Sequence, residues 1–245
     1  MKPPSSAIRG RLDEVRGRIA RAAERAGRDP GTVRLVAVVK TVAEESIREA
    51  VALGIADLAE SRVQEAELHI GAVGREAARW HMIGHLQRNK AARAVELFDR
   101  VHGVDSVDLA QALSRLALAG GRRLPVMVEV NVSGEATKFG AAPETLAGLL
   151  QRVAALPGLA LDGLMTVGAP VAQAEQARPA FARLRALREA GERALGVRLP
   201  ELSMGMSGDY WVAVEEGATL VRVGSALFGE RSSPGRDGRC SSSET

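Results

Sequence analysis

The strongest constraint on the fold is a regular alternation between apolar runs too short for helices and longer amphipathic segments. The apolar runs lie at residues 34–39, 57–60, 80–83, 100–104, 126–132, 160–166, 202–204 and 220–223. The amphipathic segments between them lie at 45–53, 61–72, 87–97, 107–119, 142–155, 171–194 and 208–217. Each is long enough to connect two parallel strands. Because an open sheet leaves unpaired edges, eight such repeats favour one (β/α)8 barrel of the TIM type, within the α/β class. An open doubly wound sheet is the alternative.

The two ends of the chain differ from this pattern. Residues 6–27 carry Leu12, Val15, Ile19 and Ala22 at helical spacing, which predicts an additional N-terminal helix. Residues 231–245 have no apolar period and are expected to form a disordered tail. The sequence therefore predicts one domain over residues 1–230, followed by that tail.

Composition excludes several classes of protein. Hydrophobic residues make up 46% and charged residues 26% of the 245-residue chain, which suits a globular domain with a large core. The single cysteine, Cys240, allows no internal disulfide, and no apolar run has membrane-spanning length, so we expect a soluble, cytoplasmic protein. The net charge of +3 arises from arginines interspersed with acidic residues, and aromatics are only 3%, which argues against nucleic-acid binding.

Function in a barrel of this type collects where the strands end. Lys40 ends the first apolar run and is expected at the barrel mouth. A lysine buried beside apolar walls has a lowered pKa, and its free amine can attack an aldehyde. Position alone also fits a strand-end lysine that reaches solvent along its stem.

Two turns near the end of the chain are candidate phosphate sites. Ser207 is predicted to cap a helix that begins near Gly208, whose free N–H groups attract anions. Gly224 and Ser225 form a second such turn after the eighth strand, where these barrels often hold phosphate. Arg222 lies on the opposite face of that strand from its neighbours and, if inward, needs an acceptor. A ring nitrogen or an ordinary ion pair would satisfy it.

Together a lysine, two anion-binding turns and an inward arginine would suit one ligand: an aromatic aldehyde that carries a phosphate and a ring nitrogen.

The chain resembles the pyridoxal-phosphate homeostasis proteins, relatives of the alanine racemase barrel domain, over nearly its whole length. The matching blocks are LVAVVKTV around Lys40, AESRVQEA at 59–66, WHMIGHLQRNK at 80–90, VHGVDSVDLA at 101–110, VEVNVSGEATKFG at 128–140, LDGLMTV at 161–167, SMGMSGDY at 203–210 and VRVGSALFG at 221–229.

The resemblance implies a binding role for named residues. It implies that Lys40 holds pyridoxal 5′-phosphate as a Schiff base, that Ser207, Gly224 and Ser225 hold the phosphate, and that Arg222 faces the pyridine nitrogen. We also assign Asn131, Met204 and Gly208 to the cofactor site. One departure is Ser61, which stands where the family usually has asparagine. If that asparagine touches the ring, the shorter serine alters affinity.

Other polar residues of the strands and loops are expected to have structural roles. His81 and His85 are four apart, but Gly84 marks a strand end between them, so we predict no metal site. His81 is expected to pack inside the barrel and His85 to line its mouth. Glu129 and Asn131 share one strand face and are expected to bond to each other or to backbone.

The implied function is buffering or delivery of the cofactor, without robust turnover and with no catalytic residues assigned. The alternatives are an amino-acid racemase and a Schiff-base aldolase. The chain's only tyrosine, Tyr210, lies beside the proposed phosphate turn, a poor place for the second base that racemisation needs. The expected partners are the cofactor and the apo forms of enzymes that use it, and the chain is expected to be a monomer or weak homodimer. A loop over residues 134–140 brings Lys138 into consideration as a second amine that relays the cofactor.

Overall fold

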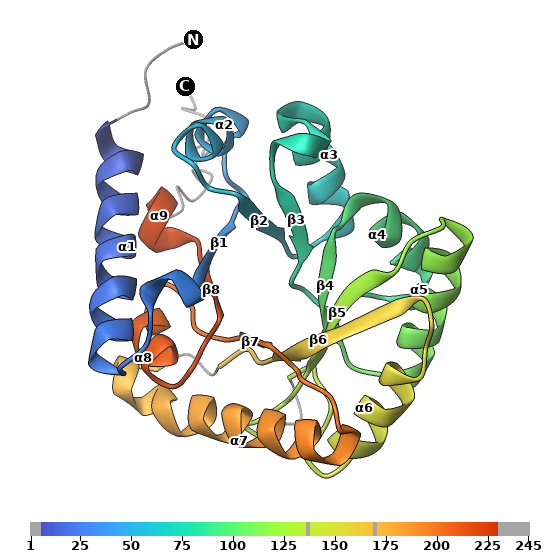
Figure 1. The fold of residues 1–245 in the computed structure, drawn as a ribbon. Helices are drawn as coiled ribbons and strands as arrows, with labels where there is room; N and C mark the ends of the chain where they lie inside the picture. The colour runs from blue at the N-terminus through green and yellow to red at the C-terminus, as the bar shows by residue number, and fades with distance from the viewer. Residues whose placement is uncertain (1–5, 136–137, 169–170, 230–245) are drawn as a thin grey trace, which may run out of the picture.

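The computed structural model describes residues 6–135, 138–168 and 171–229. The predicted tail, with Cys240, lies outside the described residues. Eight parallel strands pair in sequence order, and the eighth pairs with the first, so the sheet closes into a barrel (Figure 1). The strands are β1 (Arg34–Val38), β2 (Asp57–Glu60), β3 (Arg79–Met82), β4 (Arg100–Val104), β5 (Leu124–Glu129), β6 (Leu159–Met165), β7 (Glu201–Ser203) and β8 (Leu220–Val223). The predicted (β/α)8 barrel is confirmed.

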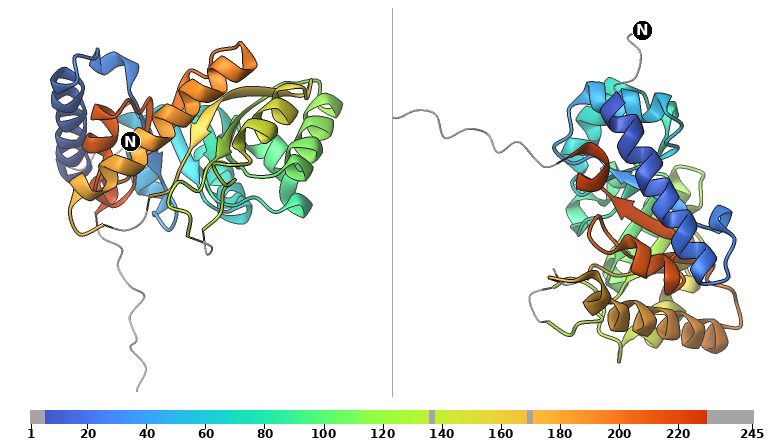
Figure 2. Two further views of the ribbon diagram at one scale, coloured as in Figure 1. Left: turned by 90° about the horizontal axis from the view of Figure 1, so that it is seen from below. Right: turned by 90° about the vertical axis from the view of Figure 1, so that its left-hand side faces the viewer.

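Helices surround the barrel (Figure 1). They are α1 (Ser6–Arg25), α2 (Glu44–Ala52), α3 (Val63–Val73), α4 (Ala91–Leu97), α5 (Val107–Ala119), α6 (Leu146–Ala154), α7 (Arg178–Leu195), α8 (Tyr210–Glu215) and α9 (Ser225–Phe228). Short 3₁₀ turns are η1 (Pro30–Thr32), η2 (Arg75–Ala77), η3 (Arg88–Lys90) and η4 (Ala174–Ala177). The additional helix α1 packs against α8 and α9, and so covers the side of the barrel where the chain closes (Figure 2).

Helix boundaries differ from expectation where local chemistry sets them. The segment predicted as a helix over residues 171–194 becomes α-helical only at Arg178, after the 3₁₀ turn η4, because Pro179 is preorganised for the first turn of a helix and not for its interior. The helix predicted from residue 208 begins at Tyr210. Asp209 Oδ1 accepts the N–H of Met206 and fixes the turn before it.

The core has two parts separated by the sheet. A large apolar layer lies between the strands and the helices, and includes Trp80, Phe98 and Phe181. A smaller cluster fills the barrel interior, formed by Val36, Val38, Ala59, Met127, Met165 and Leu220. Because successive side chains of a strand face opposite sides, this cluster identifies which positions point inward.

The floor of the barrel, at the N-terminal ends of the strands, is closed by ion pairs. The Arg79 guanidinium binds both carboxylate oxygens of Asp57, at 2.8 and 2.7 Å. Glu201 pairs with Arg34 and, at 3.1 Å, with Arg100. These pairs occupy the first residues of their strands, so the opposite end of the barrel is the open one.

Among the described residues, none of the helices combines the length and apolar character that crossing a membrane requires.

Candidate functional site

A cavity of about 460 Å³ opens at the C-terminal ends of β1 and β8. It is lined by Val38, Lys40, Thr41, Val42, Ala43, Ser46, Ile83, Met206, Ser207, Gly208, Arg222, Gly224, Ser225, Phe228 and Gly229. Segments from the two ends of the chain meet here because β8 pairs with β1. Of the eight predicted binding residues, the cavity contains Lys40, Ser207, Gly208, Arg222, Gly224 and Ser225.

Lys40 enters the cavity because of strand parity and a tight turn. Val36 and Val38 point into the barrel, so Lys40 continues the inward face just beyond the end of β1. The N–H of Val42 then bonds to the carbonyl of Val39 at 2.9 Å. Thr41, inside that turn, has a φ of +62°, which is unusual for a β-branched residue. Lys40 is exposed, which agrees with the alternative of a strand-end lysine that reaches solvent and not with a buried amine.

Ser207 connects the two predicted anion-binding turns. Its Oγ accepts hydrogen bonds from the N–H groups of Gly224 and Ala226, each at 3.2 Å. Ser207 therefore caps α9, and the prediction that it caps the helix after Gly208 is wrong. A hydroxyl that accepts two bonds still has its own proton to donate. That proton, the Ser225 hydroxyl and the Ser225 N–H are available as donors toward the cavity, whereas the N–H groups of Gly224 and Ala226 are taken by Ser207.

Arg222 is buried inside the barrel, on the strand face predicted for it. Its Nη1 donates to Ser203 Oγ at 2.7 Å and its Nη2 donates to the carbonyl oxygen of Thr166 at 2.7 Å. No ion pair to Arg222 is formed within the described residues, so the simple ion-pair explanation does not apply. Burial lowers the pKa of Arg222 to about 10, which leaves it charged at neutral pH. The cavity is therefore bordered by a cation without a carboxylate partner.

Behind Arg222 a row of polar side chains crosses the barrel. Ser203 Oγ lies 2.9 Å from His102 Nδ1, and His102 Nε2 lies 2.9 Å from His81 Nδ1. His81 Nε2 then lies 2.8 Å from Asp57 Oδ1. His81 packs inside the barrel, as predicted. Sequence reasoning missed Ser203, His102 and Asp57, although each lies at an inward position of a predicted strand.

Glu129 is a buried carboxyl at the mouth end of β5. Within the described residues the Glu129 carboxylate forms no hydrogen bond. The expected bond to Asn131 or to backbone is therefore not formed. A side chain on Gly103 or Gly140 would crowd it, since a Cβ there would lie 3.3 Å from Glu129 Oε2 or 3.2 Å from its Cγ. Burial raises the pKa of Glu129 to about 7, Arg222 opposes that rise, and Asp105 adds to it.

The other two predicted binding residues lie outside the cavity lining. Met204 is fully buried in the core. Asn131 organises the loop after β5: its Nδ2 donates to the carbonyl of Glu135 at 2.8 Å, and its Oδ1 accepts the N–H of Gly134 at 3.0 Å. Ser61 also lies outside the lining, and its N–H donates to Glu60 Oε2 at 3.1 Å.

The loop after β5 is attached to the segment after β3. Phe139 stacks on the His85 ring with centroids 3.9 Å apart, and His85 Nδ1 lies 3.2 Å from Asp105 Oδ2. Lys138 forms an ion pair with Glu135 at 2.9 Å and does not line the cavity. Within the described residues no group of three or more potential metal ligands comes together.

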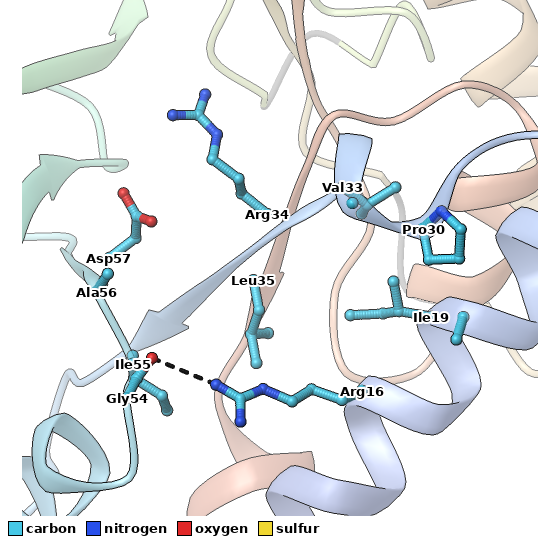
Figure 3. Close-up of a pocket in the computed structure, with 12 residues that line it drawn as sticks. Arg16, Ile19, Pro30, Val33, Arg34, Leu35, Gly54, Ile55, Ala56 and Asp57 are labelled. Atoms are coloured by element: carbon cyan, nitrogen blue, oxygen red, sulfur yellow. Dashed lines mark hydrogen bonds between the residues drawn. The ribbon is translucent and has the colours of Figure 1, made fainter.

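A second hollow of about 410 Å³ lies at the other end of the barrel, between α1 and the beginnings of β1 and β2 (Figure 3). Its charged groups are already engaged. Arg16 donates to the carbonyl of Gly54 at 3.3 Å, while Arg34 and Asp57 belong to the floor ion pairs. This hollow offers no primary amine and no free N–H groups of a helix start, so the mouth cavity is the better candidate site.

Comparison with known proteins agrees with this geometry. Residues 11–232 match the family model for the N-terminal domain of alanine racemase. A pyridoxal phosphate homeostasis protein of Pseudomonas aeruginosa is 46% identical over 226 residues, which cover 92% of this chain and 96% of that protein. The chain belongs to the pyridoxal phosphate homeostasis protein family.

Solved structures of this family and of more distant proteins share the barrel. PipY of Synechococcus elongatus PCC7942, with PLP bound, superposes with a TM-score of 0.76 at 37% identity, covering 86% of this chain and all of PipY (100%). Alanine racemase of Clostridium difficile 630, in complex with cycloserine, gives a TM-score of 0.71 at 17% identity. That match covers 93% of this chain but 60% of the racemase, and it shows the common fold alone.

Proposed function

We propose that this chain binds pyridoxal 5′-phosphate in the mouth cavity and takes part in homeostasis of that cofactor. The observation that carries the proposal is the convergence, in one cavity, of the Lys40 amine, the Ser207-capped start of α9 and the buried charge of Arg222. These groups match an aldehyde, a phosphate and a ring nitrogen in turn. The PLP bound in the related PipY structure supports the choice of ligand.

Each of these groups would bind a different part of the cofactor. The cofactor supplies an aldehyde that condenses with a primary amine, and Lys40 is the amine in the cavity. The hydroxyls of Ser207 and Ser225 and the N–H of Ser225 would donate to the phosphate, with Gly224 and Gly208 in the two turns that surround it. Arg222 presents its guanidinium to the ring nitrogen. A neighbouring guanidinium keeps that nitrogen unprotonated, which weakens the ring as an electron sink and favours storage of the cofactor over turnover.

The geometry gives no support to a racemase that uses Tyr210 as its second base. The ring of Tyr210 is buried, stacks edge-on against Trp211 with centroids 5.3 Å apart, and does not line the cavity. We therefore propose a carrier without robust turnover that supplies apo enzymes in the cytoplasm, as a monomer or weak homodimer. Sedimentation of the purified protein over a range of concentrations tests the last point.

The central test is the visible absorption that the protein retains after incubation with pyridoxal 5′-phosphate and dialysis. We expect the wild type to retain it and Lys40→Ala to lose it. Because Lys40 is exposed, the free energy of unfolding of this variant should stay within about 0.5 kcal/mol of the wild-type value. Lys90→Ala, outside the cavity, is the matched control and should keep the absorption. A Lys40→Ala protein that stays yellow, with the cofactor mapped to another lysine, would overturn the assignment.

The relay through Lys138 stays a prediction. In the structure its amine is paired with Glu135, so participation requires that ion pair to open. If the relay operates, Lys138→Ala slows transfer of bound cofactor to an apo enzyme, whereas Lys90→Ala does not. Equal transfer rates in the two variants would leave Lys138 as a loop charge.

A further inference from the structure

The row of polar groups behind Arg222 has one consistent direction of hydrogen bonding. Burial opposes ionisation of Asp57, but hydrogen bonds from His81 and Arg79 hold the pKa of its carboxyl well below the usual range. Asp57 is therefore an acceptor, and His81 Nε2 must carry a proton to donate to it. Burial lowers the pKa of His81, so the imidazole is neutral and its Nδ1 accepts.

The proton positions on His102 and Ser203 follow from that of His81. Since His81 Nδ1 accepts, His102 Nε2 carries the proton between the two rings. Burial, and then the neighbouring His81 and Arg222, hold the pKa of His102 well below its ordinary value, so its Nδ1 is a bare acceptor. The Ser203 hydroxyl must donate to that nitrogen, which turns its lone pairs toward Arg222 Nη1. Every bond from Arg222 to Asp57 thus points the same way.

This row contrasts with the apolar filling of the rest of the barrel interior. Val38, Ala59 and Met165 show that inward positions close by accept apolar side chains. Buried polar groups are costly unless every one is satisfied, and a fully satisfied network specifies one arrangement. Here the members come from β8, β7, β4, β3 and β2, and the row ends at the ion pair of Asp57 with Arg79 on the floor. Its other end is the arginine at the cavity.

We propose that Ser203, His102 and His81 are positioning residues that hold Arg222 in place for the ring nitrogen of the ligand. The chain from Asp57 orients the Ser203 hydroxyl so that it can only accept from Arg222, while the carbonyl of Thr166 holds the second nitrogen. The guanidinium is thereby fixed by neutral acceptors and not by a direct ion pair, while Glu129 and Asp209 act on its pKa from a greater distance. This inference rests on the proposed function, because it assumes that Arg222 meets the pyridine nitrogen.

The experiment compares two ligands that differ only at that nitrogen: pyridoxal 5′-phosphate and its analogue with carbon in place of the ring nitrogen. Affinities are measured by equilibrium dialysis on the full chain. A hydrogen bond to a charged group corresponds to about tenfold or more in affinity, so the wild type should prefer the natural cofactor by about that factor. We expect His102→Leu and Ser203→Ala to reduce this preference below about threefold.

The matched control is His69→Asn, which also removes a hydrogen bond between a histidine and a buried carboxylate. His69 Nδ1 lies 2.7 Å from Glu60 Oε1, outside the barrel interior, so the variant should keep the wild-type preference. Ser203→Ala removes one oxygen atom and serves as the test if His102→Leu does not fold.

The possible results distinguish failure of the proposed function from failure of the positioning role. A wild type that binds neither ligand overturns the proposed function, and one that binds both equally overturns the role of Arg222. A wild type with the preference, and variants that either keep it or lose affinity for both ligands to the same extent, would show that the row is merely structural and reject this inference.

Discussion

Glu129 provides the sharpest test of how much an ionised carboxylate destabilises the fold when it is buried in the barrel. Burial, opposed by Arg222, raises its pKa from an ordinary 4.5 to about 7. The folded state therefore retains a proton at pH values where the unfolded chain has lost it, and stability must fall as the pH rises between these two values. Since one pKa unit corresponds to about 1.4 kcal/mol, ionised Glu129 costs the native state about 3 kcal/mol at pH 8.

The variant Glu129→Gln removes the titrating group with little change of shape. Relative to the wild type it should gain about 1 kcal/mol of unfolding free energy at pH 5 and about 3 kcal/mol at pH 8. Urea unfolding of both proteins without added cofactor, at a series of pH values, measures the difference. Glu189→Gln, on the exposed face of α7, should stay within about 0.5 kcal/mol of the wild type throughout. A difference for Glu129→Gln that does not change with pH would refute the reasoning.

Three further predictions concern stability. In Gly163→Ala the new Cβ would lie 1.9 Å from a backbone carbonyl oxygen of β7, so we expect a loss of about 3 kcal/mol or more, whereas Gly148→Ala, an open helical site, should gain about 0.5–1 kcal/mol; chemical denaturation of both variants checks this. The hydrogen bond to Glu60 raises the pKa of His69, so the stabilisation by this bond is complete below the ordinary histidine pKa and is lost as the pH rises through the raised pKa. The difference in unfolding free energy between wild type and His69→Asn should therefore decrease as the pH rises, and a difference that increases with pH would contradict this. Thr41→Asn should stabilise the chain by about 1 kcal/mol, because asparagine tolerates the left-handed conformation better, and a lower melting temperature would count against the proposed strain.

The sequence by itself determined the architecture, because hydrophobic periodicity is a local property. Short apolar runs that alternate with amphipathic helices indicate a parallel sheet with both faces covered, and eight such repeats favour closure into a barrel over an open doubly wound sheet. Strand parity also placed Arg222 on the face opposite Val221 and Val223, and the structure shows that this face points into the barrel. Strand ends also located Lys40 at the mouth, whereas its degree of burial, which the sequence left open, depends on neighbours from other strands.

Only the tertiary structure decided which polar groups meet. Ser207 was correctly identified as a cap, but the helix it caps is α9, since the turn after β7 lies beside the turn after β8. Ser203, His102 and Asp57 are far apart in the chain, and nothing in the local sequence of any one strand indicates that they join. Their contacts depend on strand register and on the closure of the barrel, which bring side chains from opposite walls within hydrogen-bonding distance. Periodicity fixes the face of a strand, whereas the partner across the barrel exists only once the sheet has closed.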